Sequence, residues 1–344
     1  MQNRLTAPSP LLNKNGALAA AGYATEPLLQ YDRALIHASR LRIKEWDYYL
    51  VYDEEKAVAL TIADNGYMGL LSASVLFFGA SPREHTKSEM TFFPLGKTQL
   101  PATSKKGDVT AKSKNAEFSF FNNGETRRIS CHMGHFWDEK TLDVSLTLGP
   151  EPSESMVIAT PFLKKENAFY YNQKINCLPA DGSITLGSET YTFSQPKTFG
   201  VLDWGRGVWT YKNTWYWGSA SGLLNGAPFG FNIGCGFGDT RAATENMLFY
   251  QGKAHKLDQV FFHIPQKDGK DDYLSDWLFS SSDGRFEMQF HPVLDRFADT
   301  NALVLRSLQH QVFGYFSGYA VLDDGTVLKP DHFLGFAEKV FNKW

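Results

Sequence analysis

Strict alternation of apolar and polar residues is the feature that most constrains this chain. The runs Leu142–Leu148 and Phe286–His291 alternate at every position, so each would place its apolar side chains on one face of a β-strand. Asn, Asp, Ser and Gly, which favour tight turns, separate runs of this kind at 64–66, 122–124, 187–188 and 323–325. Short strands with turn signals every ~8–12 residues predict an all-β fold of antiparallel barrels or sandwiches with few short helices.

The length of 344 residues allows two domains of this kind. The clearest seam lies near Ser194–Thr198, where a Gln-Pro-Lys stretch ends one hairpin and an aromatic block begins. We therefore expect a lead segment over 1–30, a first β domain over 31–195 and a second over 196–344.

We also predict the structure of three further segments. The polar stretch Leu95–Lys114 is rich in Lys, Thr and Ser and predicts a loop or a sheet edge, while Gln266–Asp272 predicts a charged surface turn. Asp239–Tyr250 has the composition of a helix. Its Gly-rich neighbours and the hairpin-like Gln251-Gly252 favour a strand instead.

Composition narrows the classes of partner and compartment. A net charge of −3 lacks the basic excess of nucleic-acid-binding proteins, and no apolar run approaches the ~20 residues of a membrane span. The three cysteines are widely spaced and odd in number, which favours buried reduced thiols, although Cys235 between two glycines is also a candidate catalytic thiol. The N-terminus has no secretory h-region, so we expect a cytoplasmic location.

The aromatic block at 203–222 is the first candidate site. It contains Trp204, Trp209, Trp215 and Trp217, and two strands joined by a turn at 211–214 would point Trp215 and Trp217 to one face. A buried indole N–H needs a partner, so tryptophans beside polar residues suggest a lined cavity. Plain core packing is the other interpretation, and the sequence leaves both open.

Asp203 and Arg206 stand within that block. A charge among tryptophans is costly unless it is paired, so either the two residues pair with each other or each finds a partner across a strand. The pair could brace a barrel end. It could also serve as an acid/base carboxylate beside a guanidinium that orients substrate.

Two further stretches supply the remaining candidates. In 44–49, Lys44, Trp46 and Tyr48 share one face of a predicted strand, and neither face is plainly apolar. The Gly-rich run 229–246 allows close backbone approach and fails as a nucleotide-binding loop. The candidate catalytic residues are Asp203, Arg206 and Glu245, and the candidate ligand-binding residues are Trp204, Trp209, Trp215, Trp217, Trp46, Tyr48, Asn232 and Asn246.

Sequence motifs for a cofactor, a metal or a nucleophile are weak. His132 and His135 are three residues apart, which places their rings on opposite faces of a strand, and no third ligand lies nearby in the sequence. The run Gly218–Gly222 has Ala220 where a nucleophile elbow needs serine. We therefore expect neither a metal nor a cofactor.

Eight motifs follow one another along the chain: KEWDYY (44–49), DWGRGVW (203–209), WYWGSASG (215–222), FNIGCGFGD (231–239), ATENMLFYQGK (243–253), DRFA (295–298), HQVFGYFSG (310–318) and GFAEKV (335–340). This ordered set resembles the family catalogued as domain of unknown function 2804. More remotely, the layout is similar to proteins built from two lipocalin-like barrels, such as hydroxyneurosporene synthases and tocopherol cyclase.

The remote resemblance implies two tandem lipocalin-like barrels that hold an apolar ligand and protonate or pre-fold an alkene. Only the Asp-Trp-Gly block carries this over, onto Asp203, Trp204 and Arg206. The hypothesis is a protein that binds an apolar or amphipathic small molecule, and that acts as a hydratase, isomerase or cyclase by acid/base chemistry. The alternatives are a non-catalytic carrier of a lipid-like ligand and a carbohydrate-binding protein.

Overall fold

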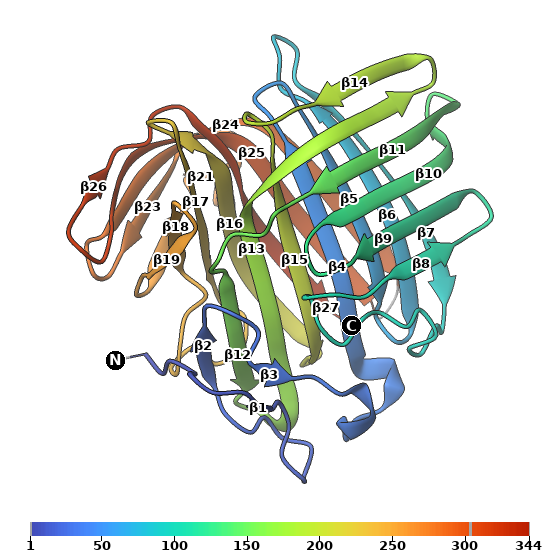
Figure 1. Ribbon diagram of the computed structural model, residues 1–344, viewed down its shortest axis with the longest axis vertical. Helices are drawn as coiled ribbons and strands as arrows, with labels where there is room; N and C mark the ends of the chain where they lie inside the picture. The colour runs from blue at the N-terminus through green and yellow to red at the C-terminus, as the bar shows by residue number, and fades with distance from the viewer. Residues whose placement is uncertain (1, 303–304, 344) are drawn as a thin grey trace.

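The computed structural model describes residues 2–302 and 305–343, and within them nearly all regular structure is β (Figure 1). The helical segments in these ranges are two single-turn 3-10 helices, η1 (Arg33–Leu35) and η2 (Arg40–Arg42). Most strands belong to two antiparallel sheets that curl into half-barrels. The predicted all-β fold with two antiparallel units and few short helices is confirmed.

The first sheet has 13 strands. Its main path runs β7 (Arg83–Phe92), β6 (Met68–Phe77), β5 (Lys56–Asp64), β4 (Ile43–Tyr52), β15 (Phe199–Val208), β13 (Lys165–Leu186), β11 (Lys140–Leu148), β10 (Arg127–Trp137), β9 (Ala116–Asn122) and β8 (Val109–Lys112). The long strand β13 also pairs with β12 (Met156–Phe162) and β14 (Glu189–Phe193), and β12 pairs with β2 (Gly22–Ala24).

The second sheet has 10 strands. Its path runs β19 (Lys253–Lys256), β18 (Met247–Tyr250), β17 (Ala227–Cys235), β16 (Lys212–Leu224), β27 (Phe333–Lys343), β25 (Leu305–Val321), β24 (Phe286–Ala302), β23 (Trp277–Ser281) and β20 (Val260–His263), with β26 (Val327–Leu328) beside β25. Two small pairs complete the strands: β1 (Ser9–Pro10) with β3 (Leu29–Gln30), and β21 (Gln266–Lys267) with β22 (Lys270–Asp271).

The predicted turns fall between paired strands. Residues 65–67 join β5 to β6, 123–126 join β9 to β10, and 187–188 join β13 to β14. Residues 95–108 form a loop before the edge strand β8, and 266–272 form a small hairpin. Of the segment 239–250, only 247–250 is a strand, which pairs with both β17 and β19.

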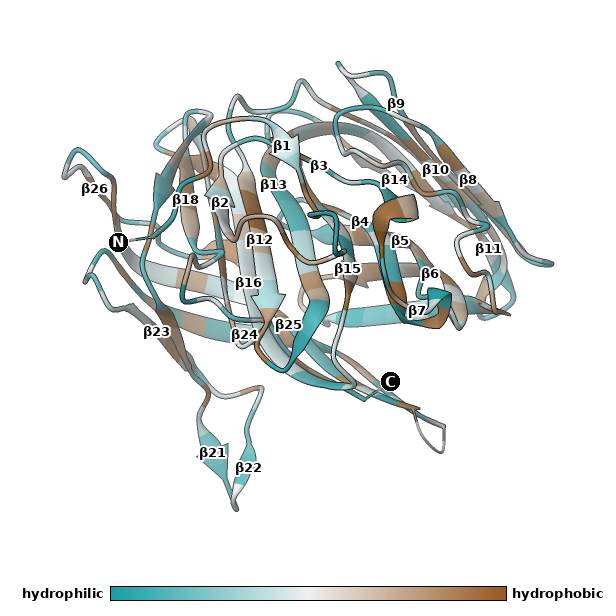
Figure 2. Cartoon of the chain, turned by 90° about the horizontal axis from the view of Figure 1, so that it is seen from below, coloured by the Kyte–Doolittle hydropathy of each residue, from teal (hydrophilic) through white to brown (hydrophobic). Residues whose placement is uncertain are grey.

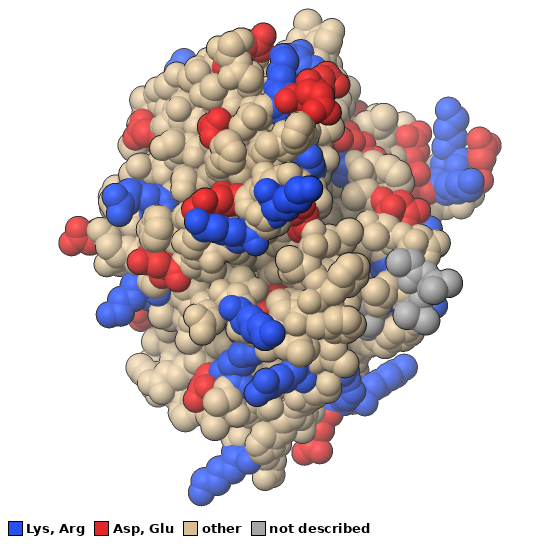
Figure 3. Space-filling view, turned by 90° about the vertical axis from the view of Figure 1, so that its right-hand side faces the viewer, with Lys and Arg blue, Asp and Glu red and all other residues tan. Residues whose placement is uncertain are grey.

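The chain passes from the first sheet to the second between β15 and β16. Residues 199–208, which the expected division placed in the second domain, therefore hydrogen-bond within the first sheet. The domain division itself stays a prediction. Basic and acidic side chains are interspersed on the face shown in Figure 3.

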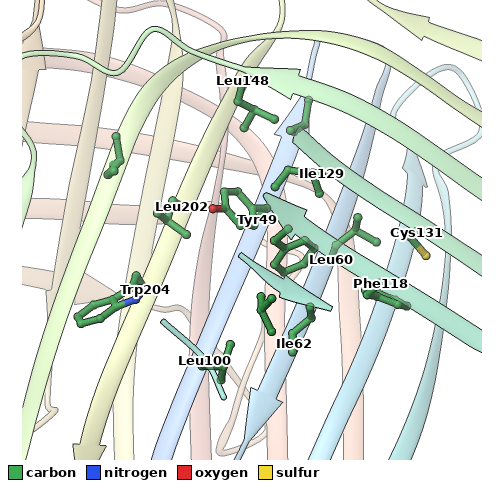
Figure 4. Packing of buried hydrophobic residues seen from close by; sticks show 14 of the residues in the cluster. Tyr49, Leu60, Ile62, Leu100, Phe118, Ile129, Cys131, Leu148, Leu202 and Trp204 are labelled. Atoms are coloured by element: carbon green, nitrogen blue, oxygen red, sulfur yellow. The ribbon is translucent and has the colours of Figure 1, made fainter. Parts of the chain in front are cut away.

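Each half-barrel has an apolar core on its inner face. In the first, Tyr49, Leu60, Phe118 and Leu202 converge from different strands (Figure 4). The second is rich in phenylalanine, with Phe231, Phe279, Phe290 and Phe316 among its fully buried side chains. The outer faces of the central strands are buried as well, because the two sheets pack against each other there. Figure 1 shows strands of the second sheet crossing behind those of the first.

A β-bulge in β13 allows hydrogen bonds between the two sheets. The pairing with β15 shifts between Ile175 and Leu178, and Cys177 takes a positive φ of 56°. The bulge turns Asn176 toward the second sheet, where its amide donates to Ser219 Oγ (2.7 Å) and to the Phe231 carbonyl (2.9 Å). The two sheets are therefore joined here by fully buried hydrogen bonds.

Replacing Asn176 tests how much these hydrogen bonds contribute to stability. Asn176→Ala would leave buried acceptors without a donor, which costs about 1–3 kcal/mol of unfolding free energy. Urea denaturation should show this loss, whereas Asn15→Ala at an exposed position should change the midpoint little. Equal stabilities of the two variants would contradict the assignment.

Candidate functional site

A buried ion pair lies between the sheets where β13 and β15 run side by side. Asp203 Oδ2 is 3.1 Å from Lys174 Nζ, and the two residues are cross-strand partners. Asn172 donates its side-chain amide to Asp203 Oδ1 (2.6 Å) and to the Trp204 carbonyl (2.8 Å). Both oxygens of Asp203 therefore have partners on β13, as a charge in this setting requires.

The lysine connects this pair to the second sheet. Lys174 Nζ lies 3.7 Å from the ring centroid of Trp217, within the range of a cation–π interaction. Trp217 Nε1 donates to Asn232 Oδ1 (2.7 Å), and the Asn232 amide donates to the Glu245 carbonyl (2.7 Å). The chain of contacts therefore crosses from β13 through β16 and β17 to the loop before β18.

Glu245 brings a second carboxyl to this place. A Cβ added to Gly234 would lie 2.5 Å from Glu245 Oε1, so the glycine makes room for the acid on β17. Burial raises the pKa of Glu245, as does the charge of Asp203, while Lys174 works in the opposite direction.

Glu338 on β27 supplies a third carboxyl. It accepts hydrogen bonds from Gln311 Nε2 (3.0 Å) and from Trp215 Nε1 (3.3 Å). Burial raises the pKa of Glu338 to about 7, against the lowering effect of Lys174 and Arg296. A carboxyl with this pKa can both give and take a proton near neutral pH.

We call Lys174, Asp203, Glu245 and Glu338 the acid cluster. Each keeps between 3 % and 8 % of its surface exposed, so all four are buried. One carboxylate is held by the lysine, and the pKa values of the other two are raised. The arrangement therefore combines a fixed negative charge with two candidate proton donors.

Five rings beside the acid cluster form what we call the aromatic cluster: Trp46, Tyr170, Trp209, Trp215 and Phe237. Trp46 stacks on Tyr170, with centroids 6.0 Å apart and planes at 12°. Phe237 meets Trp209, Trp215 and Tyr170 edge-on at 4.7–5.1 Å. The rings are in mutual contact, which is the packed arrangement that the sequence left open beside a ligand-lining role.

Asp203 and Arg206 do not pair with each other. Residues three apart on a strand point to opposite faces, and Arg206 lies inside the first half-barrel, 2.9 Å from Asp47. Its guanidinium carbon is 4.2 Å from the centroid of Trp204, which packs in the same core (Figure 4). Arg206 therefore cannot orient Asp203, and Lys174 holds that acid instead.

The last two candidate ligand-binding residues, Tyr48 and Asn246, lie in different surroundings. Tyr48 borders the acid cluster, edge-on to Trp217 at 6.1 Å, with its hydroxyl 3.5 Å from Gln311 Oε1. Asn246 accepts from the Gly234 backbone N–H (2.6 Å) and donates to the Asp258 carbonyl (2.8 Å). Asn246 thus holds the loop that carries Glu245 and lies outside the acid cluster itself.

Sequence reasoning missed Lys174 and Glu338. Lys174 is the one charged residue between Asn167 and Ala180, and Glu338 stands beside Lys339 in the motif GFAEKV, within a stretch that is otherwise apolar. A charge in such a strand needs a partner across the sheet, and this signal could have identified both residues.

Among residues 2–302 and 305–343, no group of three or more His, Cys, Asp or Glu side chains could hold a metal ion. Within the same ranges, no helix has the length and apolarity that a membrane crossing requires.

The raised pKa of Glu338 makes stability depend on pH. The unfolded chain releases this proton near pH 4.5 and the folded chain near pH 7, so stability falls as pH rises between these values. Glu338→Gln removes this loss. Between pH 4.5 and 8 the variant should gain about 3 kcal/mol relative to the wild type, at about 1.4 kcal/mol per pKa unit.

Urea titrations at several pH values measure this difference. Glu125→Gln, at an exposed turn, is the matched control and should follow the wild type at every pH. A constant difference between Glu338→Gln and the wild type would contradict the raised pKa.

Comparisons with known proteins identify similar structures and a family. A protein described as AttH from Nitrosomonas europaea has a similar structure, with a TM-score of 0.52 and 15 % identity over 96 % of this chain and 98 % of that one. Kievitone hydratase from Nectria haematococca gives a TM-score of 0.48 and 11 % identity over 88 % of each chain. No curated protein matches the sequence. The model of the family described as domain of unknown function (DUF2804) matches residues 2–344, and the chain therefore belongs to that family.

Proposed function

We propose that this protein binds an apolar or amphipathic small molecule between its two sheets and acts on it by acid/base chemistry. Hydration, isomerisation and cyclisation of a double bond are the reactions that fit. The observation that carries the proposal is Glu338, a buried carboxyl with a pKa of about 7 that is hydrogen-bonded to Trp215 of the aromatic cluster.

The proposed chemistry assigns one role to each part of the site. Glu338 gives its proton to one carbon of the double bond, and the electron pair of that bond forms the new C–H bond. The neighbouring carbon becomes cationic and is stabilised by the ring faces of the aromatic cluster. Water or an internal nucleophile then adds to that carbon, or a neighbouring C–H bond breaks, and the released proton returns to a carboxylate. Asp203, fixed by Lys174, supplies constant negative charge nearby.

Room for a guest has to come from the aromatic cluster. Phe237 lies at its centre, while the loop that carries it is held to the chain start by hydrogen bonds from Asn3 N to the Ala242 carbonyl and from Thr244 N to Gln2 Oε1 (both 2.7 Å). We infer that the Phe237 side chain turns away on binding while the loop backbone stays in place.

Truncating Phe237 tests this inference. Phe237→Ala should cost about 3 kcal/mol of stability and leave a space of one phenyl ring. Toluene should then raise the melting temperature of the variant and leave that of the wild type unchanged, because it binds only the folded variant. A folded variant that toluene does not stabilise would show that the surrounding rings collapse, and would contradict a role in ligand binding.

Deuterium incorporation tests the chemistry. The wild type is incubated in D2O with a lipid extract of its own host, and the products are analysed by mass spectrometry for deuterium bound to carbon. Hydration, isomerisation and cyclisation by protonation all give this label. Glu338→Gln keeps the size of the side chain but replaces one acceptor oxygen with an NH2 donor and removes the acidic proton. The labelling rate should therefore fall by about 10²-fold or more.

The matched control is again Glu125→Gln, which should label at the wild-type rate. An extract component that binds the wild type and quenches its tryptophan fluorescence without acquiring deuterium would identify a carrier instead of an enzyme.

A further inference from the structure

One end of the first sheet gathers five chain segments into a continuous surface. Ile43, Val208 and Phe169 are neighbours in register, so β4 begins and β15 ends at the same edge, beyond which β13 extends to Lys165. The turn between β5 and β6 and the end of β7 reach this edge too, since Met68 pairs with Phe92. We call this the strand-end surface; it comprises residues 32–42, 65–67, 92–97, 163–167 and 209–212. Figure 2, seen from below, faces this end of the molecule.

Direct contacts join the segments of the strand-end surface. The backbone N–H of Phe93 donates to the Tyr67 carbonyl (2.9 Å), and Asn167 Nδ2 donates to the His37 carbonyl (3.3 Å). Arg42 donates from Nη2 to the Trp209 carbonyl. The surface is therefore a fixed arrangement of loops, and it lies beside the aromatic cluster to which Trp209 belongs.

Large apolar side chains stand out from this surface. Phe92 is 80 % exposed, Leu163 72 % and Phe93 59 %. A single exposed leucine needs no explanation, but a group of exposed apolar side chains at one end marks a binding surface. The full set in these segments is Leu35, Leu41, Phe92, Phe93, Leu163 and Tyr211.

Basic side chains surround these apolar tips. The exposed cations of the same segments are Arg40, Lys97, Lys164, Lys165 and Lys212, while the exposed carboxylates are Asp32 and Glu166. A hollow of about 420 Å³ opens among them. Its lining contains His37, Arg42 and Lys165, the polar Ser39 and Asn167, the carboxylate Glu166, and the apolar Ala38 and Val208. Its basic and polar donors outnumber the one carboxylate and suit a phosphate or another anion.

We propose that the strand-end surface docks on an anionic lipid bilayer. Aromatic and leucine side chains at loop tips insert below the headgroups, while the lysines and arginines meet the negative surface charge. The hollow beside Arg42 receives a headgroup phosphate. This chemistry combines apolar insertion with charge attraction, and both observations stand independently of the reaction proposed above.

Vesicle sedimentation tests the docking. The full chain is mixed with phosphatidylcholine vesicles that contain phosphatidylglycerol, and with vesicles of phosphatidylcholine alone. The wild type should sediment with the anionic vesicles, bind the neutral ones far less, and be released as salt rises. Phe92→Ser with Phe93→Ser, and separately Lys164→Glu with Lys165→Glu, should each lower the partition coefficient at least about tenfold.

Leu274→Ser with Leu278→Ser is the matched control, because these leucines are also exposed, at 61 % and 56 %, but belong to the second half of the chain. This variant should bind like the wild type. Failure of the wild type to sediment with anionic vesicles, or equal loss in the control variant, would overturn the proposal. A dimer in sedimentation velocity that the Phe92/Phe93 variant abolishes would assign the surface to a second copy of the chain, and would also overturn it.

Discussion

Burial of both faces of β4, β13 and β15 is the constraint on which the rest of the structure depends. One face of each strand packs into the first half-barrel and the other packs against the second sheet. Over β4, β15 and residues 168–178 of β13, no face is left for solvated charges, so each polar side chain there needs a partner within the protein. Lys174 with Asp203 and Arg206 with Asp47 meet this need on opposite sides of the sheet.

The acid cluster contains more carboxyls than cations, and this excess gives it the capacity for proton transfer. Three carboxyls face one lysine, and Arg296 is the other cation that lowers the pKa of Glu338. Burial and mutual repulsion both disfavour the ionised form of a carboxyl, and taking up a proton removes that charge. The pKa values of Glu245 and Glu338 are therefore raised. The same constraint that shapes the fold thus places carboxyls with raised pKa values beside aromatic rings.

Alternation and turn residues were sufficient to predict the all-β fold, because both act locally along the chain. The opposite faces of Asp203 and Arg206 also follow from their spacing, by the argument that separates His132 from His135. Which strands become neighbours could not be predicted in this way. Nothing in the sequence near Asp203 shows that Lys174 lies across from it or that Glu338 approaches from the other sheet. The bulge at Asn176–Cys177 depends on that packing as well, since its amide finds its acceptors on β16 and β17.

Packing contacts, and not the linker, hold the two half-barrels together. Only residues 209–211 join the sheets between β15 and β16, and a connection of a few residues is enough to form a hinge. The side chains buried between the sheets and the hydrogen bonds of Asn176 in the β13 bulge would all have to separate in such a motion. Opening the halves would therefore expose apolar surface at a high cost in free energy, and a guest enters between them at lower cost by rotation of side chains.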